Sequence, residues 1–432
     1  MTTHAYPSER EPKRPEREPK VRAAVPGLRS EGATKERTTD EAGGRGPERP
    51  EASGKTLPDE GGHGGSSAPE ASAGNTVPLQ LIDQDGRPGG NPGELTLPEP
   101  DVLRELHRRM VLGRRFDTQA TALTKQGRLA VYPSSRGQDA CQVGAALALR
   151  DQDWLFPTYR DSVAVLTRGV PAEETLTLLR GDWHCGYDPH AYRVAPQCTP
   201  LATNTLHAVG LAYAARLKHQ DQVALVLLGD GATSEGDTHE ALNFAGVWKA
   251  PVVFLVQNNG YAISVPLAKQ TAAPTLAAKG IGYGVPSLLI DGNDAAAVYA
   301  AVRSGVERAV AGGGPTLIEA VTYRIEAHTN ADDATRYRAS AEVEAWLGRD
   351  PIARLESYLR AGALLDDAAA GRLAAEAERL AGDVRDRMNA DVHPDPAELF
   401  EHVYARPTAM LERQRAALAA ELAELAELGE MP

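Results

Sequence analysis

Two continuous apolar runs, each ended by small and polar residues, constrain the possible fold of this 432-residue chain more than any other feature. The runs are residues 223–228 and 252–256, and the stretch 238–249 between them has a helical pattern. Continuous apolar strands separated by helices are typical of a parallel sheet that is covered on both faces. With further strands expected at 287–290 and 316–323, the sequence predicts an α/β fold with a parallel sheet flanked by helices.

Helices are expected where apolar residues recur at spacings of three or four. A capped helix is expected to start near Asp101, and the segment 352–387 is rich in Ala, Leu, Glu and Arg. The last expected helix, 407–429, carries a stripe of leucines that is typical of a docking face. The remaining expected helices cover 138–149, 205–218, 275–279 and 294–311.

The N-terminal part of the chain differs from the rest in composition. Residues 1–77 mix charge and proline without apolar periodicity, so we expect a disordered low-complexity tail there. A linker is expected at 78–100, where glycine and proline cluster. The α/β domain is then expected over 101–345, and a helical C-terminal region over 346–432.

Charge and apolar content argue against several classes of protein. The formal net charge is −13, and the excess of acidic residues lies in the part of the chain after the N-terminal tail. An acidic folded region disfavours a nucleic-acid binder or a basic membrane-binding surface. No apolar run approaches the length of about 18 residues that a membrane span needs, and the first residues lack the apolar core of a secretory signal. The three cysteines form no CxxC pair, so we expect a reduced, cytoplasmic protein.

Polar residues directly follow both apolar runs. Asp230 lies in a Gly-Asp-Gly turn after the first run, and Asn259 follows the second. A right-handed crossover would bring both strand ends to the sheet edge where open α/β sheets bind ligands. A carboxylate and an amide oxygen suit Mg²⁺, whose coordination is completed by phosphates and water. A lone Gly-Asp-Gly is usually a turn, but the whole unit favours a diphosphate–Mg²⁺ site in which the amides of Gly231 and Ala232 face the anion.

This pattern resembles the thiamine-diphosphate motif, and the chain from about Pro100 to Pro407 is similar to one family. That family is the alpha subunit of the decarboxylating component of 2-oxo acid dehydrogenase complexes, and the likeness is greatest to the branched-chain type. The resemblance implies a thiamine-diphosphate-binding fold, with the diphosphate-binding domain in 101–345. It is carried by the segments 156–161, 199–203, 229–237, 258–264, 291–294 and 322–324, together with His328.

The resemblance also implies roles for individual residues. Asp230 and Asn259 would bind Mg²⁺ through their side chains, and Tyr261 through its carbonyl oxygen. His328 would be the catalytic residue, close to the thiazolium ring of the cofactor. Thiamine diphosphate would contact Tyr159, Arg160, Thr199, Leu201, Asp230, Gly231, Ala232, Asn259, Tyr261 and His328.

Simpler interpretations of several residues stay open at this point. Tyr159 could be a core tyrosine and Arg160 a surface ion pair. His328 precedes a loop-like stretch, so it could be a solvated loop histidine. Three further histidines have a spacing that is too irregular to favour metal binding, namely His184, His190 and His207.

A few positions limit how far the resemblance extends. Thr203 and Asn204 follow Cys198 in a loop that binds K⁺ in some relatives, which makes K⁺ a second candidate cation. Gln257 stands where the animal branched-chain enzyme has a phosphate-contacting arginine, so the source of positive charge for the diphosphate is open. Thr329 stands where animal relatives carry a regulatory phosphoserine.

The resemblance implies an enzyme that works with other chains. No motif for the cofactor-activating glutamate is present, and the chain is too short for both cofactor-binding domains, so the site is expected at an interface with a beta subunit. Two alpha and two beta chains would oxidatively decarboxylate 3-methyl-2-oxobutanoate and pass the acyl group to the lipoyl domain of a dihydrolipoyl acyltransferase. Pyruvate or acetoin is the alternative substrate. A non-catalytic scaffold is disfavoured because Arg160, Asp230, Asn259 and His328 are all present.

Overall fold

The computed structural model describes residues 76–183, 185–390, 395–401 and 403–428. The tail expected at 1–77 lies outside the described residues, apart from its last two positions. The strands are β1 (Gln80–Ile82), β2 (Pro88–Asn91), β3 (Trp154–Phe156), β4 (Ala224–Gly229), β5 (Val252–Asn258), β6 (Tyr261–Ala262), β7 (Val265–Pro266), β8 (Ser287–Asp291) and β9 (Thr316–Val321).

The helices alternate with the strands through the middle of the chain and dominate its C-terminal third. The α-helices are α1 (Pro100–Lys125), α2 (Asp139–Ala148), α3 (Ser162–Thr167), α4 (Ala172–Arg180), α5 (Pro189–Tyr192), α6 (Thr203–Leu217), α7 (Gly236–Trp248), α8 (Ala295–Val310), α9 (Ser340–Leu347), α10 (Pro351–Ala361), α11 (Asp367–Asn389), α12 (Glu398–Glu401) and α13 (Ala409–Leu428). The 3₁₀ helices are η1 (Gly231–Ser234), η2 (Leu267–Lys269), η3 (Ala277–Tyr283) and η4 (Ala334–Arg336).

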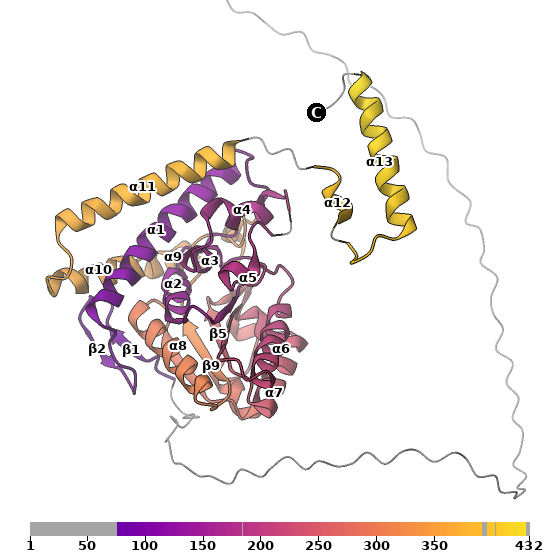
Figure 1. Cartoon of the computed structure of the whole chain (residues 1–432). Coiled ribbons are helices and arrows are strands. Elements are labelled where there is room, and N and C mark those ends of the chain that lie inside the picture. Colours follow the sequence, from indigo (N-terminus) through magenta and orange to yellow (C-terminus); the bar gives the residue numbers. More distant parts are fainter. Residues whose placement is uncertain (1–75, 184, 391–394, 402, 429–432) are drawn as a thin grey trace, which may run out of the picture. The chain divides into compact units, whose positions relative to one another are not determined.

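A five-stranded sheet with the order β3-β4-β5-β9-β8 forms the centre of the fold (Figure 1). Every neighbouring pair in it is parallel. The two apolar runs of the sequence form β4 and β5, which pair with Leu225 opposite Val253. Because parallel strands end at the same edge, the residues that follow β4 and β5 come together there. The predicted α/β fold with a parallel sheet flanked by helices is therefore confirmed.

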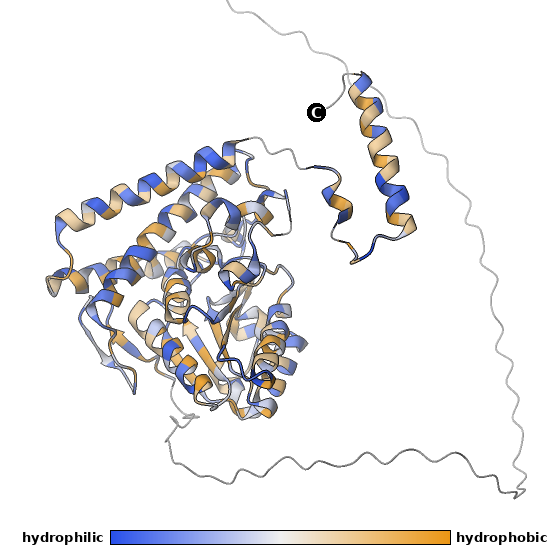
Figure 2. Ribbon diagram, viewed as in Figure 1, coloured by the Kyte–Doolittle hydropathy of each residue, from blue (hydrophilic) through white to orange (hydrophobic). Residues whose placement is uncertain are grey.

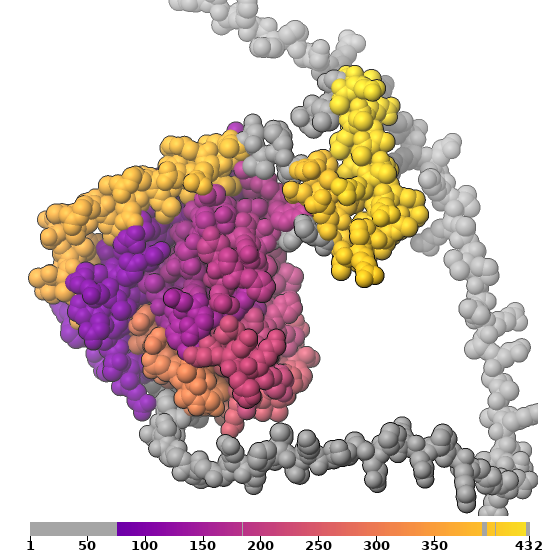
Figure 3. All heavy atoms as spheres, viewed as in Figure 1, coloured from indigo at the N-terminus to yellow at the C-terminus, as the bar shows by residue number. Residues whose placement is uncertain are grey.

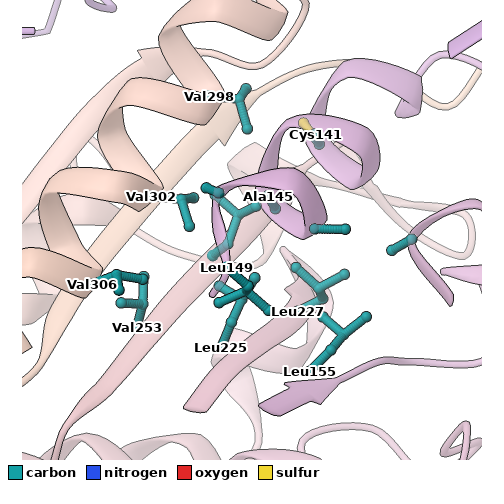
Figure 4. Packing of buried hydrophobic residues seen from close by; sticks show 14 of the residues in the cluster. Cys141, Ala145, Leu149, Leu155, Leu225, Leu227, Val253, Val298, Val302 and Val306 are labelled. Carbon is teal, nitrogen blue, oxygen red and sulfur yellow. The ribbon is translucent and has the colours of Figure 1, made fainter. Parts of the chain in front are cut away.

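One face of the sheet packs against α2 and α8. Leu225 and Leu227 of β4 point into a buried cluster with Ala145 of α2 and with Val298 and Val302 of α8 (Figure 4). All of these side chains are fully buried. Each large aliphatic side chain buried in this way stabilises the fold by roughly 1.5–3 kcal/mol. This packing holds the strands, and therefore their ends, in fixed positions.

The opposite face of the sheet packs against α6 and α7. Successive strand residues point to opposite faces, so Val226 and Leu228 of β4 lie with Phe254 of β5 in a second cluster. Small residues of the two helices, including Ala212 and Ala245, complete it. Leu228 is the last apolar residue before the Gly-Asp-Gly turn, so this layer fixes where the turn begins.

A third group of helices covers the outside of the α2–α8 layer. Leu106 and Phe116 of α1 are fully buried, and Leu359 of α10 belongs to the same cluster. α11 lies along α1 (Figure 3) and directs its buried Ala377 and Val384 to this side. Figure 2 shows the alternation of hydrophilic and hydrophobic residues along α11 that such one-sided packing requires.

The segment 78–100, for which the sequence predicts a linker, contains the β1–β2 hairpin. The main chain of Leu79 exchanges hydrogen bonds with β8, and Ile82 is 1% exposed. One carboxylate oxygen of Asp294 accepts the N–H groups of Leu81 and Ile82, each at 2.7 Å. The residues of β2 are Pro-Gly-Gly-Asn, which have little strand propensity. These tertiary contacts therefore hold a hairpin that local sequence does not indicate.

Two predicted helical segments differ from the structure in detail. The stretch 275–279 overlaps the 3₁₀ helix η3, which contains two glycines, rather than an α-helix. The stretch 352–387 is divided between α10 and α11, because Ala363 adopts a left-handed φ of 53° and Asp366 caps the start of α11. Helix α13 matches the last predicted helix. In the part of the chain that the structure describes, no helix is both long and apolar enough to span a bilayer.

Candidate functional site

A pocket lies at the carboxyl edge of the sheet, beyond the ends of β4 and β5. Loops that follow β3, β4, β5 and β9 supply most of its lining. All of the predicted cofactor-binding residues except Thr199 line this pocket, whereas Thr199 is exposed in the loop before α6. The lining residues are Gln138, Thr158, Tyr159, Arg160, Leu201, Gly229, Asp230, Gly231, Ala232, Glu235, Gln257, Asn259, Tyr261, Ala262, Ile263, Arg324 and His328.

Asp230 and Asn259 stand side by side in the pocket, as the strand pairing predicts. The main-chain N–H of Asn259 donates to Oδ1 of Asp230 at 3.3 Å. Gln270 donates from Nε2 to the other oxygen, Oδ2, at 2.6 Å. The next residue, Gly231, has no room for a side chain, because a Cβ there would lie 2.7 Å from Cβ of Ala262. The carboxylate is therefore held at a tight turn.

Asp230 is a buried carboxylate that forms no ion pair with the described residues. The residue is 1% exposed. Burial raises the pKa of Asp230, although the hydrogen bond from Gln270 and the charge of Arg324 act in the opposite direction. A cation bound beside the carboxylate would offset this cost. The described residues contain no group of three or more His, Cys, Asp or Glu side chains that could hold a metal ion. The donors present therefore suit a cation such as Mg²⁺ that keeps several non-protein ligands.

Two arginines that have no carboxylate partner among the described residues meet at His328 on one wall of the pocket. Nη2 of Arg160 lies 3.1 Å from Nδ1 of His328 and donates to the carbonyl oxygen of the same residue at 2.9 Å. Nη1 of Arg324 lies 3.3 Å from the same Nδ1 atom. Arg160 is 5% exposed and Arg324 is 1% exposed. Two buried guanidinium groups without ion pairs among the described residues make this wall suited to an anion.

His328 is held as a neutral imidazole. Burial and the charges of Arg160 and Arg324 lower the pKa of His328 to about 4, against a smaller opposite effect of Asp332. Because guanidinium groups can only donate, Nδ1 of His328 must accept, and the ring proton is on Nε2. Asp332 also accepts the main-chain N–H of His328 at 2.8 Å. The proposal of a solvated loop histidine is therefore wrong.

Tyr159 belongs to the same wall. Its ring stands edge-on to His328 with the ring centroids 6.1 Å apart, and the guanidinium carbon of Arg160 is 5.6 Å from the centroid of the tyrosine ring. Tyr159 is only half-buried and lines the pocket, so it is not a core tyrosine. Arg160 forms no ion pair with the described residues, so the interpretation as a surface ion pair is also wrong.

The sequence does not single out three residues that line the pocket. Gln138 precedes α2 and lies far from the strand ends in sequence, so only the fold brings it to the pocket. Arg324 lies within the segment 322–324, which carries part of the family resemblance, but the resemblance assigns no role to this arginine. Ile263 has a φ of 55°, which is rare for a β-branched residue, and Nη2 of Arg324 donates to its carbonyl oxygen at 2.7 Å. Such strain is frequent at functional sites.

The loop matched to a K⁺ site already has protein partners for its polar groups. Nδ2 of Asn204 donates to the carbonyl oxygens of Phe156 and Leu227, at 3.3 and 2.9 Å. The carbonyl oxygen of Cys198 accepts the main-chain N–H of Tyr159 at 3.1 Å. Thr203 is half-buried at the start of α6. Binding of K⁺ in this loop stays a prediction.

The remaining candidate residues that the structure describes are not among the residues that line the pocket. His190 packs edge-on against Trp154 with ring centroids 5.4 Å apart, and His207 is exposed on α6. His184 lies outside the described residues. Thr329 is half-buried beside His328. These positions give no support to a metal site made by the histidines.

Comparison with known proteins identifies the family of the chain. Residues 107–396 match the family described as Dehydrogenase E1 component, which is more than half of the chain. The chain therefore belongs to the dehydrogenase E1 component family.

Individual relatives agree with this assignment. The 3-methyl-2-oxobutanoate dehydrogenase subunit alpha of Mycobacterium tuberculosis is 48% identical over 346 residues, which cover 80% of this chain and 94% of that protein. The pyruvate dehydrogenase E1 component subunit alpha of Staphylococcus aureus is 40% identical over 284 residues, which cover 65% of this chain and 76% of the relative. The Staphylococcus epidermidis protein of the same name is 39% identical over 292 residues, with coverages of 67% and 78%.

Proposed function

We propose that the chain is the alpha subunit of a 2-oxo acid dehydrogenase that oxidatively decarboxylates branched-chain 2-oxo acids such as 3-methyl-2-oxobutanoate. The observation that carries the proposal is the pocket itself. A buried carboxylate, Asp230, lines the same pocket as Arg160 and Arg324, two buried guanidinium groups that form no ion pair with the described residues. The 48% identity to a 3-methyl-2-oxobutanoate dehydrogenase subunit alpha supports the branched-chain substrate. The more distant pyruvate dehydrogenase relatives make pyruvate the alternative.

The family implies thiamine diphosphate as the cofactor, and the residues of the pocket fit this group. Asp230, the side chain of Asn259 and the carbonyl oxygen of Tyr261 would hold Mg²⁺, because they offer the oxygen ligands that this ion prefers. Arg160 would hold the diphosphate, since a planar guanidinium can bond two phosphate oxygens at once. Tyr159 lies against Arg160 and would limit its movement.

Thiamine diphosphate, when bound, supplies a carbanion that adds to the 2-oxo carbon and a ring that accepts the electrons as CO₂ leaves. The protein contributes orientation and fixed hydrogen bonds. His328 is neutral and carries its proton on Nε2, so it would act as a hydrogen-bond donor to a negatively charged oxygen of the substrate or acyl group. Burial and the charges of Arg160 and Arg324 lower the pKa of His328 and so keep it in this state across the physiological range.

The proposal includes partner chains. Leu201 and Ile263 line the pocket although they are 40% and 54% exposed, and large apolar side chains at the rim of a site suit a covering protein surface. The relatives are named as alpha subunits, so we infer a beta subunit over this rim, in a tetramer of two alpha and two beta chains. The acyl group would then pass to the lipoyl domain of a dihydrolipoyl acyltransferase.

The proposed compartment is the cytoplasm. A reducing compartment suits the three free thiols of the chain, Cys141, Cys185 and Cys198.

The test compares two acidic residues of similar sequence position in the complex reconstituted with the beta chain. Asp230→Asn should abolish Mg²⁺-dependent binding of thiamine diphosphate, measured by isothermal titration calorimetry. Glu240→Gln, on the exposed surface of α7, should leave binding unchanged. Normal cofactor affinity in the Asp230 variant would contradict the proposed metal ligand.

Steady-state rates separate the two substrates. We expect kcat/KM for 3-methyl-2-oxobutanoate to exceed that for pyruvate by roughly 10–200-fold, which is the range that small apolar differences between substrates provide. A preference for pyruvate would replace the branched-chain assignment with the alternative.

A further inference from the structure

Four side chains, of which Gln138, Gln257 and Asn259 line the pocket, form one directed chain of hydrogen bonds, which we call the amide relay. Nδ2 of Asn259 donates to Oε1 of Gln138 at 3.1 Å. Nε2 of Gln138 in turn donates to Oε1 of Gln257 at 3.0 Å. Nε2 of Gln257 then donates to Oδ1 of Asp161 at 2.7 Å. All four residues are buried, and none is more than 6% exposed. Each amide therefore has one choice of orientation that satisfies both of its neighbours.

Asp161 sets the direction of the relay. Its Oδ2 atom accepts the main-chain N–H and the hydroxyl of Thr158, both at 2.7 Å. A carboxylate only accepts hydrogen bonds, so Gln257 must turn its NH₂ group toward Oδ1. The oxygen of Gln257 is then left facing Gln138. Asp161 thus determines which way the side-chain amide of Gln257 is turned, with its NH₂ group toward Asp161 and its oxygen toward Gln138.

The same logic continues to Asn259. Gln138 must turn its NH₂ group toward the oxygen of Gln257, and its own oxygen then receives the NH₂ group of Asn259. Oδ1 of Asn259 is thus left free of Gln138 and accepts the main-chain N–H of Tyr261 at 3.3 Å, and Asn259 lines the pocket together with Asp230. An amide oxygen and an amide nitrogen have nearly the same shape, so only the hydrogen-bond partners decide which of the two faces the pocket.

We propose that Gln138 and Gln257 are positioning residues which, together with Asp161, present the oxygen of Asn259 rather than its nitrogen to the metal ion. The inference rests on the proposed function, because it assumes that Asn259 is a ligand of Mg²⁺. An NH₂ group in the same place could not bind the ion. Gln138, Gln257 and Asp161 thus preorganise a metal ligand without contacting the metal themselves.

The relay gives a role to Gln257. In animal branched-chain enzymes an arginine at this position contacts phosphate. Here the side chain is 2% exposed, and both ends of its amide are engaged within the protein. The positive charge for the diphosphate would then come from Arg160 and Arg324, which line the same pocket. Gln257 therefore supplies no charge to the diphosphate, and in our proposal it fixes the orientation of the Gln138 amide instead.

The test is a variant that reverses the relay with almost no change of shape. In Asp161→Asn the oxygen of the new amide still accepts the two Thr158 donors, so its NH₂ group faces Nε2 of Gln257. Gln257, Gln138 and Asn259 must each turn over to avoid paired donors. We expect the affinity for Mn²⁺, measured by electron paramagnetic resonance on the complex with the beta chain and thiamine diphosphate, to fall about tenfold or more.

A second substitution should repair the first. In the double variant Asp161→Asn with Gln257→Glu, the new carboxylate accepts from both neighbours, so Gln138 and Asn259 return to their original orientation. The affinity for Mn²⁺ should return close to the wild-type value. A merely structural role of these residues would instead make the double variant weaker than either single variant.

Controls separate the relay from general damage. Gln138→Leu removes the central amide and should also weaken Mn²⁺ binding, whereas Gln197→Leu removes a buried amide outside the relay and should not. Unfolding temperatures are measured for all variants. Wild-type affinity in Asp161→Asn, or no recovery in the double variant, overturns the relay alone. A wild-type complex that binds no Mn²⁺ in the presence of the cofactor overturns the proposed function and the relay together.

Discussion

The state of His328 gives a quantitative prediction. Its pKa of about 4 means that at pH 6 about 1% of the imidazole is protonated, whereas an ordinary histidine with a pKa of 6.5 would be about three-quarters protonated. Replacing Arg324 with Met removes one of the two guanidinium groups that face Nδ1. The pKa of His328 should then rise toward its usual value. Arg136→Met removes a charge that pairs with Glu326 instead, so it should leave the pKa near 4.

Hydrogen–deuterium exchange at the imidazole C2 position, followed by peptide mass spectrometry across a pH series, reports the titration of individual histidines in the full complex. The wild-type protein should show no His328 midpoint between pH 5 and 8, and the midpoint in Arg324→Met should lie at a higher pH than in the wild type, although burial and Arg160 still act on the ring. A wild-type midpoint near pH 6.5 would refute the assignment of a neutral Nε2–H donor. Such a result would mean that the two arginines do not face His328 in solution.

The same shift has a consequence for stability. The folded pKa of His328 lies below its unfolded value, so the unfolded chain takes up the proton first as the pH falls. The contribution of His328 to stability is therefore fully present above about pH 6.5 and is lost as the pH falls from there toward 4. His328→Gln should flatten this part of the dependence of the unfolding free energy on pH.

Substitutions of Gly137 and Asp294, with one of Gly127 as a control, test the fold around the site. Gly137 has a φ of 96°, and a Cβ there would lie 2.0 Å from the carbonyl oxygen of Tyr323, so Gly137→Ala should lower the free energy of unfolding by at least about 2 kcal/mol. Gly127→Ala has a similar φ but open space around it, so urea unfolding should register only about 1 kcal/mol. Asp294→Ala removes the cap of α8 and the acceptor for the β1 hairpin strand, at a cost of roughly 2–4 kcal/mol. Amide exchange in residues 80–82 should then accelerate, and unchanged protection there would contradict the anchoring role of Asp294.

Four strands of the central sheet, β4, β5, β8 and β9, and the adjacency of Asp230 and Asn259 could be predicted because they depend on local features, whereas the three-residue strand β3 was missed. A continuous apolar run specifies a strand that is buried on both faces, and one intervening helix specifies a parallel neighbour. The sheet order could not be read in the same way, because nothing local to β8 or β9 indicates that β9 lies between β5 and β8. The β1–β2 hairpin was missed for a related reason, since Asp294 holds it from a distant part of the chain.

In the pocket, too, some features could be predicted from local sequence and others depend on contacts between distant residues. Glycine, aspartate and asparagine at strand ends are visible in the sequence, and most of the residues assigned by resemblance line the pocket. Gln138 was missed because its contacts with Gln257 and Asn259 span more than a hundred residues of sequence. The neutral state of His328 could not be predicted either, because it depends on two arginines that converge only in the folded chain.

The exposed leucine and isoleucine at the pocket mouth also affect how the protein must be produced. A cell that made this polypeptide in excess would hold copies whose Leu201 and Ile263 face water, and such surfaces favour non-specific association. Balanced synthesis of the two kinds of subunit would therefore leave few unpaired copies of this chain that could precipitate. Laboratory preparations of the isolated chain should scatter light more strongly with rising concentration than preparations in which both subunits are made together.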